Sequence, residues 1–535
     1  MLAGCLLALF MRRPGPLATT VPGDLGDPLL LTWILAWGGH AVSTAPAGLW
    51  DGNVFAPLHN TLAFSDSLLG YLPFGLVGSG PDAALVRYNI VFLVAYALAF
   101  GAVYLLVRQL GLGRGPALVA GLAYAFNPWR ISQTGHLQVL SSGGIPLALA
   151  MLARGHGLGR RHPGTGPAAR GRPGWAVAGW AVATWQVSLG FGLGLQLAYL
   201  LGVVTLVVLW TWRRDRPSRG LLLADAAGLL LFVVVGVALA LPYAQAVRDH
   251  PQARRDAATV ALFSPTPAGF VTAPPQSRLW GTQSAGRLAA QSAPAEDAMA
   301  PGLLVTVLAA LGLAPGPWSR RRRLVLVGGV LVLCVLALGT NGPYGGRFSY
   351  LPLLEHAPGW QGVRTPSRLV TTAWLFLALL AAHGVAVLRR AAAWDGEPGA
   401  AGLRTMATGL VALVLLLEGA DTHAHPAPRP APVALGDLPA PLLVLPSDDS
   451  RDTTVMWWST DRFPPVVNGV SGFVPAELTR LRAAADSLPA PDGLAALRAA
   501  GVRTLVLLPG STTRLPAGLP AREEGGATVV DLRSG

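Results

Sequence analysis

The sequence predicts an α-helical polytopic membrane protein with about 11 transmembrane helices and a small C-terminal extracytoplasmic α/β domain. Of its 535 residues, 52% are hydrophobic and only 13% are charged, which is about half the charge of a soluble chain. Apolar blocks long enough to cross a bilayer recur up to residue 419, and the acids concentrate after it. This composition excludes a soluble single-core protein and a disordered chain.

The predicted spans follow from the length of the apolar blocks, since a spanning helix needs roughly 20 mostly apolar residues. The eleven blocks are 2–18, 83–107, 116–128, 137–153, 175–188, 190–212, 220–242, 301–316, 324–340, 369–388 and 405–419. Arg12 and Arg13 fall in or just beyond the first block. We expect a shortened first span there; the alternatives are a helix that ends at these arginines and a cleaved signal peptide.

Every second connection between these spans is rich in arginine. Five connections hold 18 arginines and three acids, and they are 108–115, 154–174, 213–219, 317–323 and 389–404. Because arginine-rich connections stay in the cytoplasm, we expect these five on the cytoplasmic side of the membrane. The membrane expected is the inner (plasma) membrane of a bacterium. The outer face then carries the loops 19–82, 243–300 and 341–368 and the segment 420–535.

The net charge of +13 and the two cysteines exclude two further classes of protein. The arginines lie in short runs between apolar blocks, so the charge fits membrane topology and no nucleic-acid partner is expected. Cys5 and Cys334 both lie in apolar stretches, which excludes a disulfide framework and a cysteine-rich metal site. The first partner predicted by composition is therefore the lipid bilayer.

Residues 420–535 differ in character from the transmembrane domain at 1–419. Apolar runs of strand length occur at 441–446, 502–508 and 527–532. Helical spacing occurs at 475–486 and 493–500. We therefore expect a small α/β domain, in which no glycine-rich phosphate-binding or dinucleotide motif occurs.

The first outer loop carries the acids best suited to chemistry. Asp24 and Asp27 lie three residues apart, so we expect them on one side of a turn, where they could share a cation or a substrate hydroxyl. Asp27 precedes Pro28, and capping of the next helix is its alternative role. Asp24 has no such role and is the stronger candidate for a catalytic base. Asp66, between two serines, is a substrate-binding candidate or an N-cap.

Cationic side chains expected on the outer side are candidates for binding a phosphate, because guanidinium groups match phosphate oxygens. They are Arg130, Arg278, Arg364 and Arg368, together with His136. The alternative for each arginine is an interfacial side chain that contacts lipid headgroups. For His136 the alternative is a packed or capping residue.

Three residues of the C-terminal segment are weaker candidates for binding a sugar acceptor. Trp457 and Trp458 offer indole rings for stacking, and Asn468 offers an amide. The alternative is an ordinary small-domain core with turns, since Asn-Gly at 468–469 is a strong turn signal. The sequence leaves both interpretations open.

Several motifs extend over nearly the whole chain. They are GDLGDP (23–28), WILAW (33–37), FAPLHNTLAFSD (55–66), FNPWR (126–130), VRTPSR (363–368) and VNGVSGFVP (467–475). In these motifs the chain resembles a group of bacterial multi-pass membrane proteins that includes the YfhO-like proteins and is grouped with the GT-C glycosyltransferase superfamily.

This resemblance implies a GT-C-like fold, a polyprenyl-phosphate sugar donor, transfer outside the cytoplasm and an acidic base in the first outer loop. The base on this chain would be Asp24 or Asp27, which are also the ligands expected for an optional divalent cation, Mg²⁺ or Mn²⁺. The expected function is inverting transfer of a sugar from the lipid-linked donor to a glycan, lipid or protein of the cell envelope. The alternative is a non-catalytic envelope membrane protein, or a lipid-carrier transporter or flippase, of the same architecture.

Overall fold

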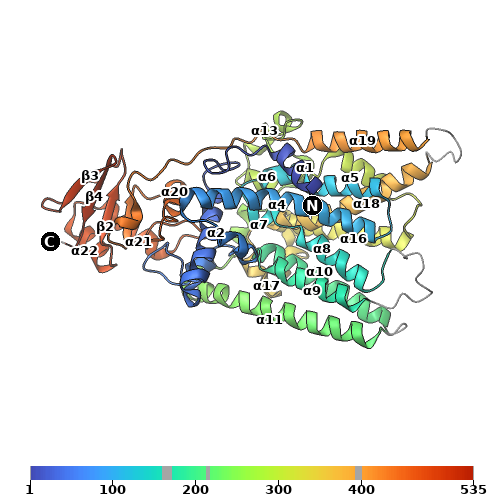
Figure 1. Cartoon of the computed structure of the whole chain (residues 1–535), viewed down its shortest axis with the longest axis horizontal. Coiled ribbons are helices and arrows are strands. Elements are labelled where there is room, and N and C mark those ends of the chain that lie inside the picture. The colour runs from blue at the N-terminus through green and yellow to red at the C-terminus, as the bar shows by residue number, and fades with distance from the viewer. Residues whose placement is uncertain (1, 160–171, 213–216, 392–399, 534–535) are drawn as a thin grey trace. The chain divides into compact units, whose positions relative to one another are not determined.

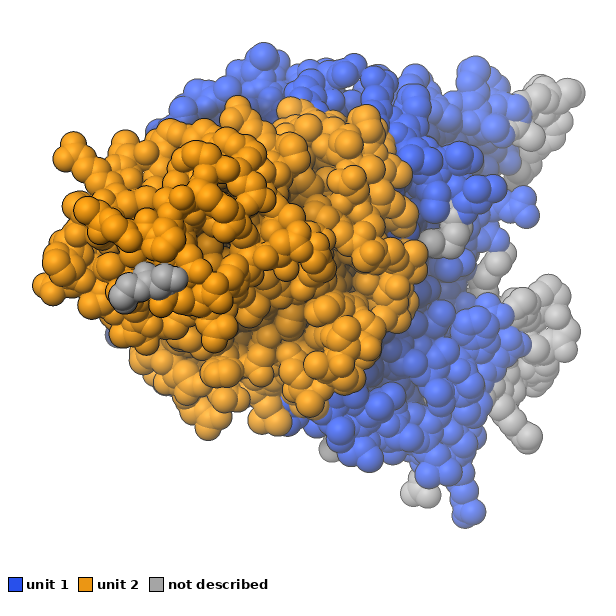
Figure 2. All heavy atoms as spheres, turned by 60° about the vertical axis from the view of Figure 1, so that its left-hand side comes forward, with its two compact units in different colours: residues 1–13, 92–237, 255–423 blue, residues 14–91, 238–254, 424–535 orange. Residues whose placement is uncertain are grey.

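The computed structural model describes residues 2–159, 172–212, 217–391 and 400–533. The arginine-rich connections 154–174, 213–219 and 389–404 lie partly outside the described residues. Packing divides the chain into two compact units, which are coloured separately in Figure 2. Unit 1 comprises residues 1–13, 92–237 and 255–423, and unit 2 comprises residues 14–91, 238–254 and 424–535.

Unit 1 is built from helices (Figure 1). In chain order, with α4 and α11 each contributing residues to both units, they are α1 (Leu2–Arg12), α4 (Gly80–Gln109), α5 (Arg114–Ala125), α6 (Pro128–Ser132), α7 (Leu137–Leu140), α8 (Gly144–Gly155), α9 (Pro173–Val187), α10 (Phe191–Trp212), α11 (Arg219–Asp249), α12 (Ala257–Leu262), α13 (Gly281–Leu288), α14 (Pro294–Asp297), α15 (Leu303–Leu311), α16 (Arg320–Ala337), α17 (Tyr350–His356), α18 (Val370–Ala391) and α19 (Ala400–Glu418).

A helix occurs at each of the eleven expected spans. Five segments of the described chain are long and apolar enough to cross a membrane, namely Gly80–Gln109, Leu137–Gly155, Phe191–Trp210, Arg219–Asp249 and Pro366–Ala391. Some of the others are short or charged: α1 has 11 residues, and α16 begins with four arginines. The total of eleven spans therefore stays a prediction.

The end of α1 corrects the expected first span, because the helix stops at Arg12 instead of continuing to residue 18. The Arg12 side chain is buried and forms an ion pair with Asp421. It also donates a hydrogen bond to the carbonyl oxygen of Gly419 at 3.3 Å and lies over the ring of Tyr96 at 4.5 Å. An arginine at the end of a short apolar run is thus enclosed by protein within unit 1.

Helix α18 is the centre of packing in unit 1, where it lies against α5, α15 and α16. Two glycines let α15 and α18 approach closely. A Cβ atom on Gly384 would lie 2.0 Å from the carbonyl oxygen of Leu308, and one on Gly312 would lie 2.2 Å from that of Leu380. Only glycine permits backbones this close, as is common between membrane helices.

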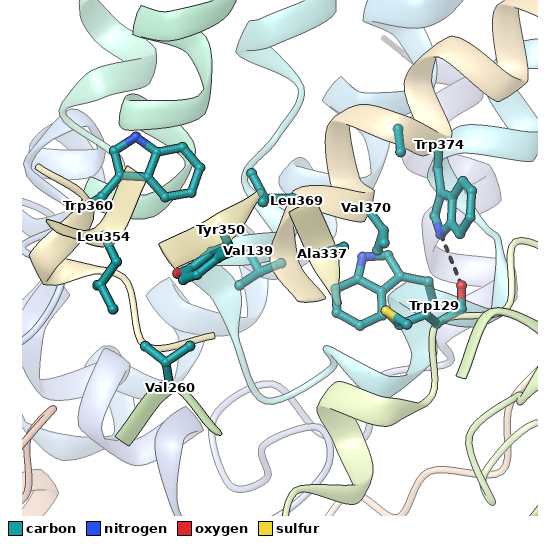
Figure 3. Packing of buried hydrophobic residues seen from close by; sticks show 12 residues of the cluster. Trp129, Val139, Val260, Ala337, Tyr350, Leu354, Trp360, Leu369, Val370 and Trp374 are labelled. Carbon is teal, nitrogen blue, oxygen red and sulfur yellow. Dashed lines mark hydrogen bonds between the residues drawn. The ribbon is translucent and has the colours of Figure 1, made fainter. Parts of the chain in front are cut away.

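An aromatic cluster surrounds the N-terminal end of α18 (Figure 3). Trp129, Tyr350, Trp360 and Trp374 pack there with aliphatic side chains. The indole N–H of Trp374 donates a hydrogen bond to the carbonyl oxygen of Met299 at 3.1 Å. The polar atom of this tryptophan therefore has a hydrogen-bond partner inside the core.

Unit 2 combines helices with one mixed sheet, whose strand order is β1-β2-β4-β3. Its elements are α2 (Asp27–Thr44), α3 (Leu72–Gly75), α20 (Asp449–Trp458), α21 (Ala476–Asp486), α22 (Pro491–Ala499), β1 (Leu442–Leu445), β2 (Thr504–Leu507), β3 (Ala521–Glu524) and β4 (Ala527–Asp531). Strands β1 and β2 are parallel and fully buried, whereas β2–β4 and β4–β3 are antiparallel. Strand β3 is exposed throughout.

Helix α2 lies within the segment 19–82 and joins that segment to the C-terminal segment in unit 2. It packs against α3 and against α20. The contact with α3 depends on two glycines, because a Cβ atom on Gly39 would lie 2.0 Å from the carbonyl oxygen of Gly75. The start of α2, where Asp27 is the first residue and Asp24 lies three residues before it, is therefore fixed by packing along the rest of the helix.

Candidate functional site

The two acids Asp24 and Asp27, in the segment 19–82, lie in one turn that leads into α2. Asp24 is exposed, and its Oδ1 accepts a hydrogen bond from the backbone N–H of Gly26 at 2.7 Å. Asp27 is half-buried and is the first residue of α2, followed by Pro28. Pro28 fits the first turn of a helix, where its missing N–H has no cost. Asp24 and Asp27 therefore belong to one local turn, and their sharing of a cation or hydroxyl stays a prediction.

This acidic turn is tied to two other parts of unit 2. The backbone N–H of Gly23 donates to the carbonyl oxygen of Ala424 at 3.0 Å. The hydroxyl of Thr453 in α20 donates to the carbonyl oxygen of Leu25 at 2.8 Å. Gly23 has a φ of +92°, a conformation that glycine adopts without strain. These bonds hold the backbone of the turn while the Asp24 carboxylate stays exposed.

Asp66 lies in a second part of the same loop. It is half-buried and close enough to Tyr243 to interact with it electrostatically. The Tyr243 hydroxyl accepts a hydrogen bond from the backbone N–H of Ser67 at 3.0 Å, and its ring meets Trp50 edge-on at 5.9 Å. The loop and the end of α11 thus place an acid near two aromatic rings within unit 2.

The candidates for acceptor binding are all buried in unit 2. The indole N–H of Trp457 donates to the carbonyl oxygen of Pro81 at 2.9 Å, and that of Trp458 to the carbonyl oxygen of Arg429 at 2.8 Å. Asn468 is fully buried; its amide bonds to both backbone groups of Val444 and to Asp452. In this structure the polar atoms of these three side chains face protein groups.

Arg130 occupies a closed environment in unit 1. Its guanidinium donates to the Ser142 hydroxyl at 2.9 Å and to the carbonyl oxygen of Leu140 at 2.8 Å. The rings of Tyr96 and Tyr124 lie 4.8 and 5.9 Å from its guanidinium carbon. With 3% of the residue exposed, Arg130 connects the elements around α6 and α7.

Arg368 and His136 meet at a buried acid that the sequence did not single out. Both Nε and Nη2 of Arg368 donate to Oε1 of Glu296, at 3.1 and 2.8 Å. The Ser367 hydroxyl donates to Oε2 of the same carboxylate. Burial alone would raise the pKa of Glu296, but Arg368, His136 and Ser367 together hold that pKa below its usual value.

Arg364 lies near a second arginine, Arg255, in unit 1. The guanidinium of Arg364 lies 4.9 Å from the centre of the Phe263 ring. The backbone N–H of Arg255 donates to the carbonyl oxygen of Gln361 at 3.1 Å, so the two chain segments are adjacent. Burial and the positive charge of Arg364 both lower the pKa of Arg255. Two like charges close together favour an anion between them.

Arg278 is exposed on the loop 243–300, and its backbone N–H donates to the carbonyl oxygen of Ala420 at 2.9 Å. The predicted residues therefore separate into the acids and acceptor candidates of unit 2 and the cations of unit 1. Arg368 and His136 both act on Glu296, and Asp24 and Asp27 lie three residues apart at the entry to α2.

The ion pair between Arg12 and Asp421 was also missed by the sequence analysis. Burial alone would raise the pKa of Asp421, but Arg12 and His423 hold that pKa below its usual value. The only feature of the sequence that pointed to this pair was Arg12, a charged residue that interrupts the first apolar block.

The optional metal site is restricted to the two acids of the turn. Among the residues that the structure describes, no group of three or more His, Cys, Asp or Glu side chains is arranged to hold a metal ion. Mg²⁺ is often bound by one or two carboxylates together with water and substrate phosphates. Asp24 and Asp27 fit only that kind of site.

Comparison with known proteins identifies solved structures whose fold is similar to that of this chain. No protein-family model and no curated protein matches the chain. Among solved structures, arabinofuranosyltransferase AftD from Mycobacteria matches 99% of this chain and 39% of its own, at 16% identity and a TM-score of 0.54.

Two further structures match at lower TM-scores. ArnT from Cupriavidus metallidurans matches 99% of this chain and 97% of its own, at 15% identity and a TM-score of 0.36. Oligosaccharyltransferase AglB from Archaeoglobus fulgidus, solved with an inhibitory peptide and a dolichol-phosphate, matches 95% of this chain and 68% of its own, at 13% identity and a TM-score of 0.43.

The likeness to AftD extends along almost the whole chain, although the chain spans only 39% of AftD. At 16% identity such a likeness shows the fold and not the reaction. The likeness confirms the GT-C-like fold that the motifs implied, and the described chain contains five segments long and apolar enough to cross a membrane.

Proposed function

We propose that this protein is a membrane glycosyltransferase that moves a sugar from a polyprenyl-phosphate-linked donor to a cell-envelope acceptor on the outer face of the membrane. The observation that carries the proposal is the GT-C-like fold, matched to AftD over 99% of the chain. The exposed carboxylate of Asp24, in the first outer loop, supplies the group that such a reaction needs.

Asp24 is the proposed base because of its position relative to α2. Asp27 lies in the first turn of that helix, where a carboxylate stabilises the helix N-terminus and so has a structural task. Asp24 precedes the helix and is exposed, with a backbone N–H fixing one of its oxygens. A fixed, exposed carboxylate can accept a proton from an incoming hydroxyl.

The proposed reaction is a single displacement at the anomeric carbon of the donor sugar. Asp24 takes the proton of the acceptor hydroxyl as the acceptor oxygen forms a bond to the anomeric carbon. The bond from that carbon to the phosphate oxygen breaks, and its electron pair leaves with the polyprenyl phosphate. Because attack and departure occur on opposite faces, the configuration at this carbon inverts.

Arg364 is the proposed phosphate-binding residue among the predicted cations. Within unit 1 Arg364 lies beside Arg255, and an anion bound there would offset both positive charges. A divalent cation held by Asp24 and Asp27 would add charge stabilisation for the departing phosphate; the proposed proton transfer does not depend on it.

The experiment compares Asp24→Asn with wild type in detergent, using a labelled polyprenyl-phosphate sugar and envelope extract as the acceptor source. We expect Asp24→Asn to lower the rate of label transfer by about 10²–10⁴-fold, the usual effect of losing a general base. The matched control is Asp82→Asn, which removes another exposed acid of unit 2 and should retain the wild-type rate.

Equal transfer by Asp24→Asn and wild type would overturn the assignment of the base. If the wild-type protein consumes no lipid-linked sugar, the result would instead favour the non-catalytic envelope protein or the lipid-carrier transporter of the same architecture. Both variants must elute as wild type does in size-exclusion chromatography, so that a folding defect is not read as lost catalysis.

A further inference from the structure

Unit 1 contains a cavity of about 430 Å³ that none of the predicted site residues lines. Its walls come from α4, α8, α9, α10, α11 and α18. Helices α8, α9 and α10 lie side by side in this part of the unit (Figure 1). The volume falls within the range of about 300–1,000 Å³ that is usual for sites of small organic ligands.

The lining is almost entirely aliphatic, with leucines from five helices. Val204, Leu209, Leu222 and Leu229 line the cavity and are also exposed at the surface of α10 and α11. Only 22% of the apolar window of each of these two helices is buried inside the protein. In a membrane protein, such surfaces face lipid hydrocarbon, so the cavity opens toward the bilayer and not toward water.

One part of the cavity wall is polar. Oδ1 of Asp225 accepts a hydrogen bond from the indole N–H of Trp180 at 3.0 Å, and Oδ2 lies 3.3 Å from Nε2 of His156. His156 directly follows α8, at the start of the arginine-rich connection 154–174. Arg154, two residues earlier, lies over the ring of Trp175 at 4.4 Å.

We propose that this cavity binds one acyl chain of an anionic glycerophospholipid, with the headgroup at the end marked by His156 and Arg154. An apolar cavity of this kind takes up hydrocarbon more readily than water. Arg154 and the exposed Arg172, whose backbone N–H donates to the carbonyl oxygen of Gly155 at 2.7 Å, lie at this end of α8 and attract an anionic headgroup. The Asp225–His156 pair closes the polar end of the cavity. The lipid is a bound component separate from the sugar donor, so the proposal does not depend on glycosyl transfer.

The test uses the full chain in nanodiscs of phosphatidylethanolamine that contain a phosphatidylglycerol with a diazirine in one acyl chain. After photolysis, mass spectrometry maps the labelled peptides, which we expect from 201–209 and 222–229. Ala226 lines the cavity, whereas the neighbouring Ala227 is exposed and does not. Ala226→Trp should lower labelling by about tenfold by filling the space, and Ala227→Trp should leave it unchanged.

A second pair of variants on α10 guards against a local folding defect. Val208 lines the cavity and Val207 is exposed outside it, so Val208→Trp should lower labelling and Val207→Trp should not. Labelling that is equal in both members of each pair would overturn the proposal. Loss of label on addition of excess polyprenyl phosphate, but not of excess unlabelled phosphatidylglycerol, would also overturn it by assigning the cavity to an isoprenoid chain.

Discussion

Glu296 and Arg368 form a largely buried ion pair in unit 1, in which the charge of the acid depends on pH. Because Arg368, His136 and Ser367 lower the pKa of Glu296 in the folded protein despite its burial, its ionised form stabilises the fold. This contribution to stability is complete when the pH is above the pKa of the acid in the unfolded chain, about 4.3. It is lost as the pH falls through the lower pKa that Glu296 has in the folded protein.

We expect Glu296→Gln to lower the free energy of unfolding by about 3 kcal/mol near neutral pH, because it leaves the largely buried Arg368 without its charged partner. The difference from wild type should shrink below about pH 4.3, where the wild-type acid also loses its charge. Thermal unfolding in detergent, followed by tryptophan fluorescence across this range, measures both effects. Glu355→Gln, at an exposed acid of α17, is the control. A difference that stays constant with pH would contradict the prediction.

The residue scale also shows what the sequence could and could not predict about the site. The expected side of the membrane and the residue type singled out Arg368 as a phosphate candidate. Its partner Glu296 could not be predicted, because the two residues lie 72 positions apart. The same holds for Arg12 and Asp421, which lie 409 positions apart. In contrast, the turn that joins Asp24 to Asp27 is local, with a bond between residues 24 and 26, and such geometry follows from the sequence.

Two of the three glycines of helix α11 have very different surroundings. A Cβ atom on Gly228 would lie 2.3 Å from Cγ of Trp180 in α9, whereas one on Gly236 would have no heavy atom within 4 Å. We expect Gly228→Ala to lower the free energy of unfolding by about 1–3 kcal/mol, because it overpacks the contact between α9 and α11. Gly236→Ala should instead be neutral or raise it by up to about 1 kcal/mol through helix propensity.

The melting temperatures of these two variants, measured in one detergent, test the contrast. Displacement of the Trp180 ring would also disturb its hydrogen bond to Asp225, so tryptophan emission should shift in Gly228→Ala alone. Equal melting temperatures for the two alanine variants would show that α9 can move away from α11 at little cost.

Elements with a strong apolar pattern were predictable, and elements without one were not. Strands β1, β2 and β4 lie within the three apolar runs of the C-terminal segment, and α21 and α22 coincide with the two runs of helical spacing. Strand β3 has the sequence Ala-Arg-Glu-Glu and is exposed throughout, so it lacks the alternation that marks a half-buried strand. Its charged side chains protect an edge strand from pairing with other chains.

At the scale of the whole molecule, the sequence divides the chain at residue 419, and packing places a boundary nearby at 423. Packing also groups the segment after 423 with residues 14–91 and 238–254. Backbone pairing within this unit includes the N–H of Val466 and the carbonyl oxygen of Asn53 at 2.7 Å. Such pairing between distant segments is invisible in composition, which reports only the apolar blocks.

The sidedness of the membrane is the remaining prediction, and the proposed reaction depends on it. Arginine-rich connections stay in the cytoplasm, so a cysteine at Ser319→Cys, exposed at the start of α16, should react with an impermeant maleimide only after the membrane is broken. A cysteine at Thr512→Cys, exposed in the C-terminal segment, should react in intact spheroplasts. The unsubstituted chain, whose Cys5 and Cys334 lie in apolar helices, gives the background. The reverse pattern would place the loop with Asp24 in the cytoplasm and would exclude transfer on the outer face.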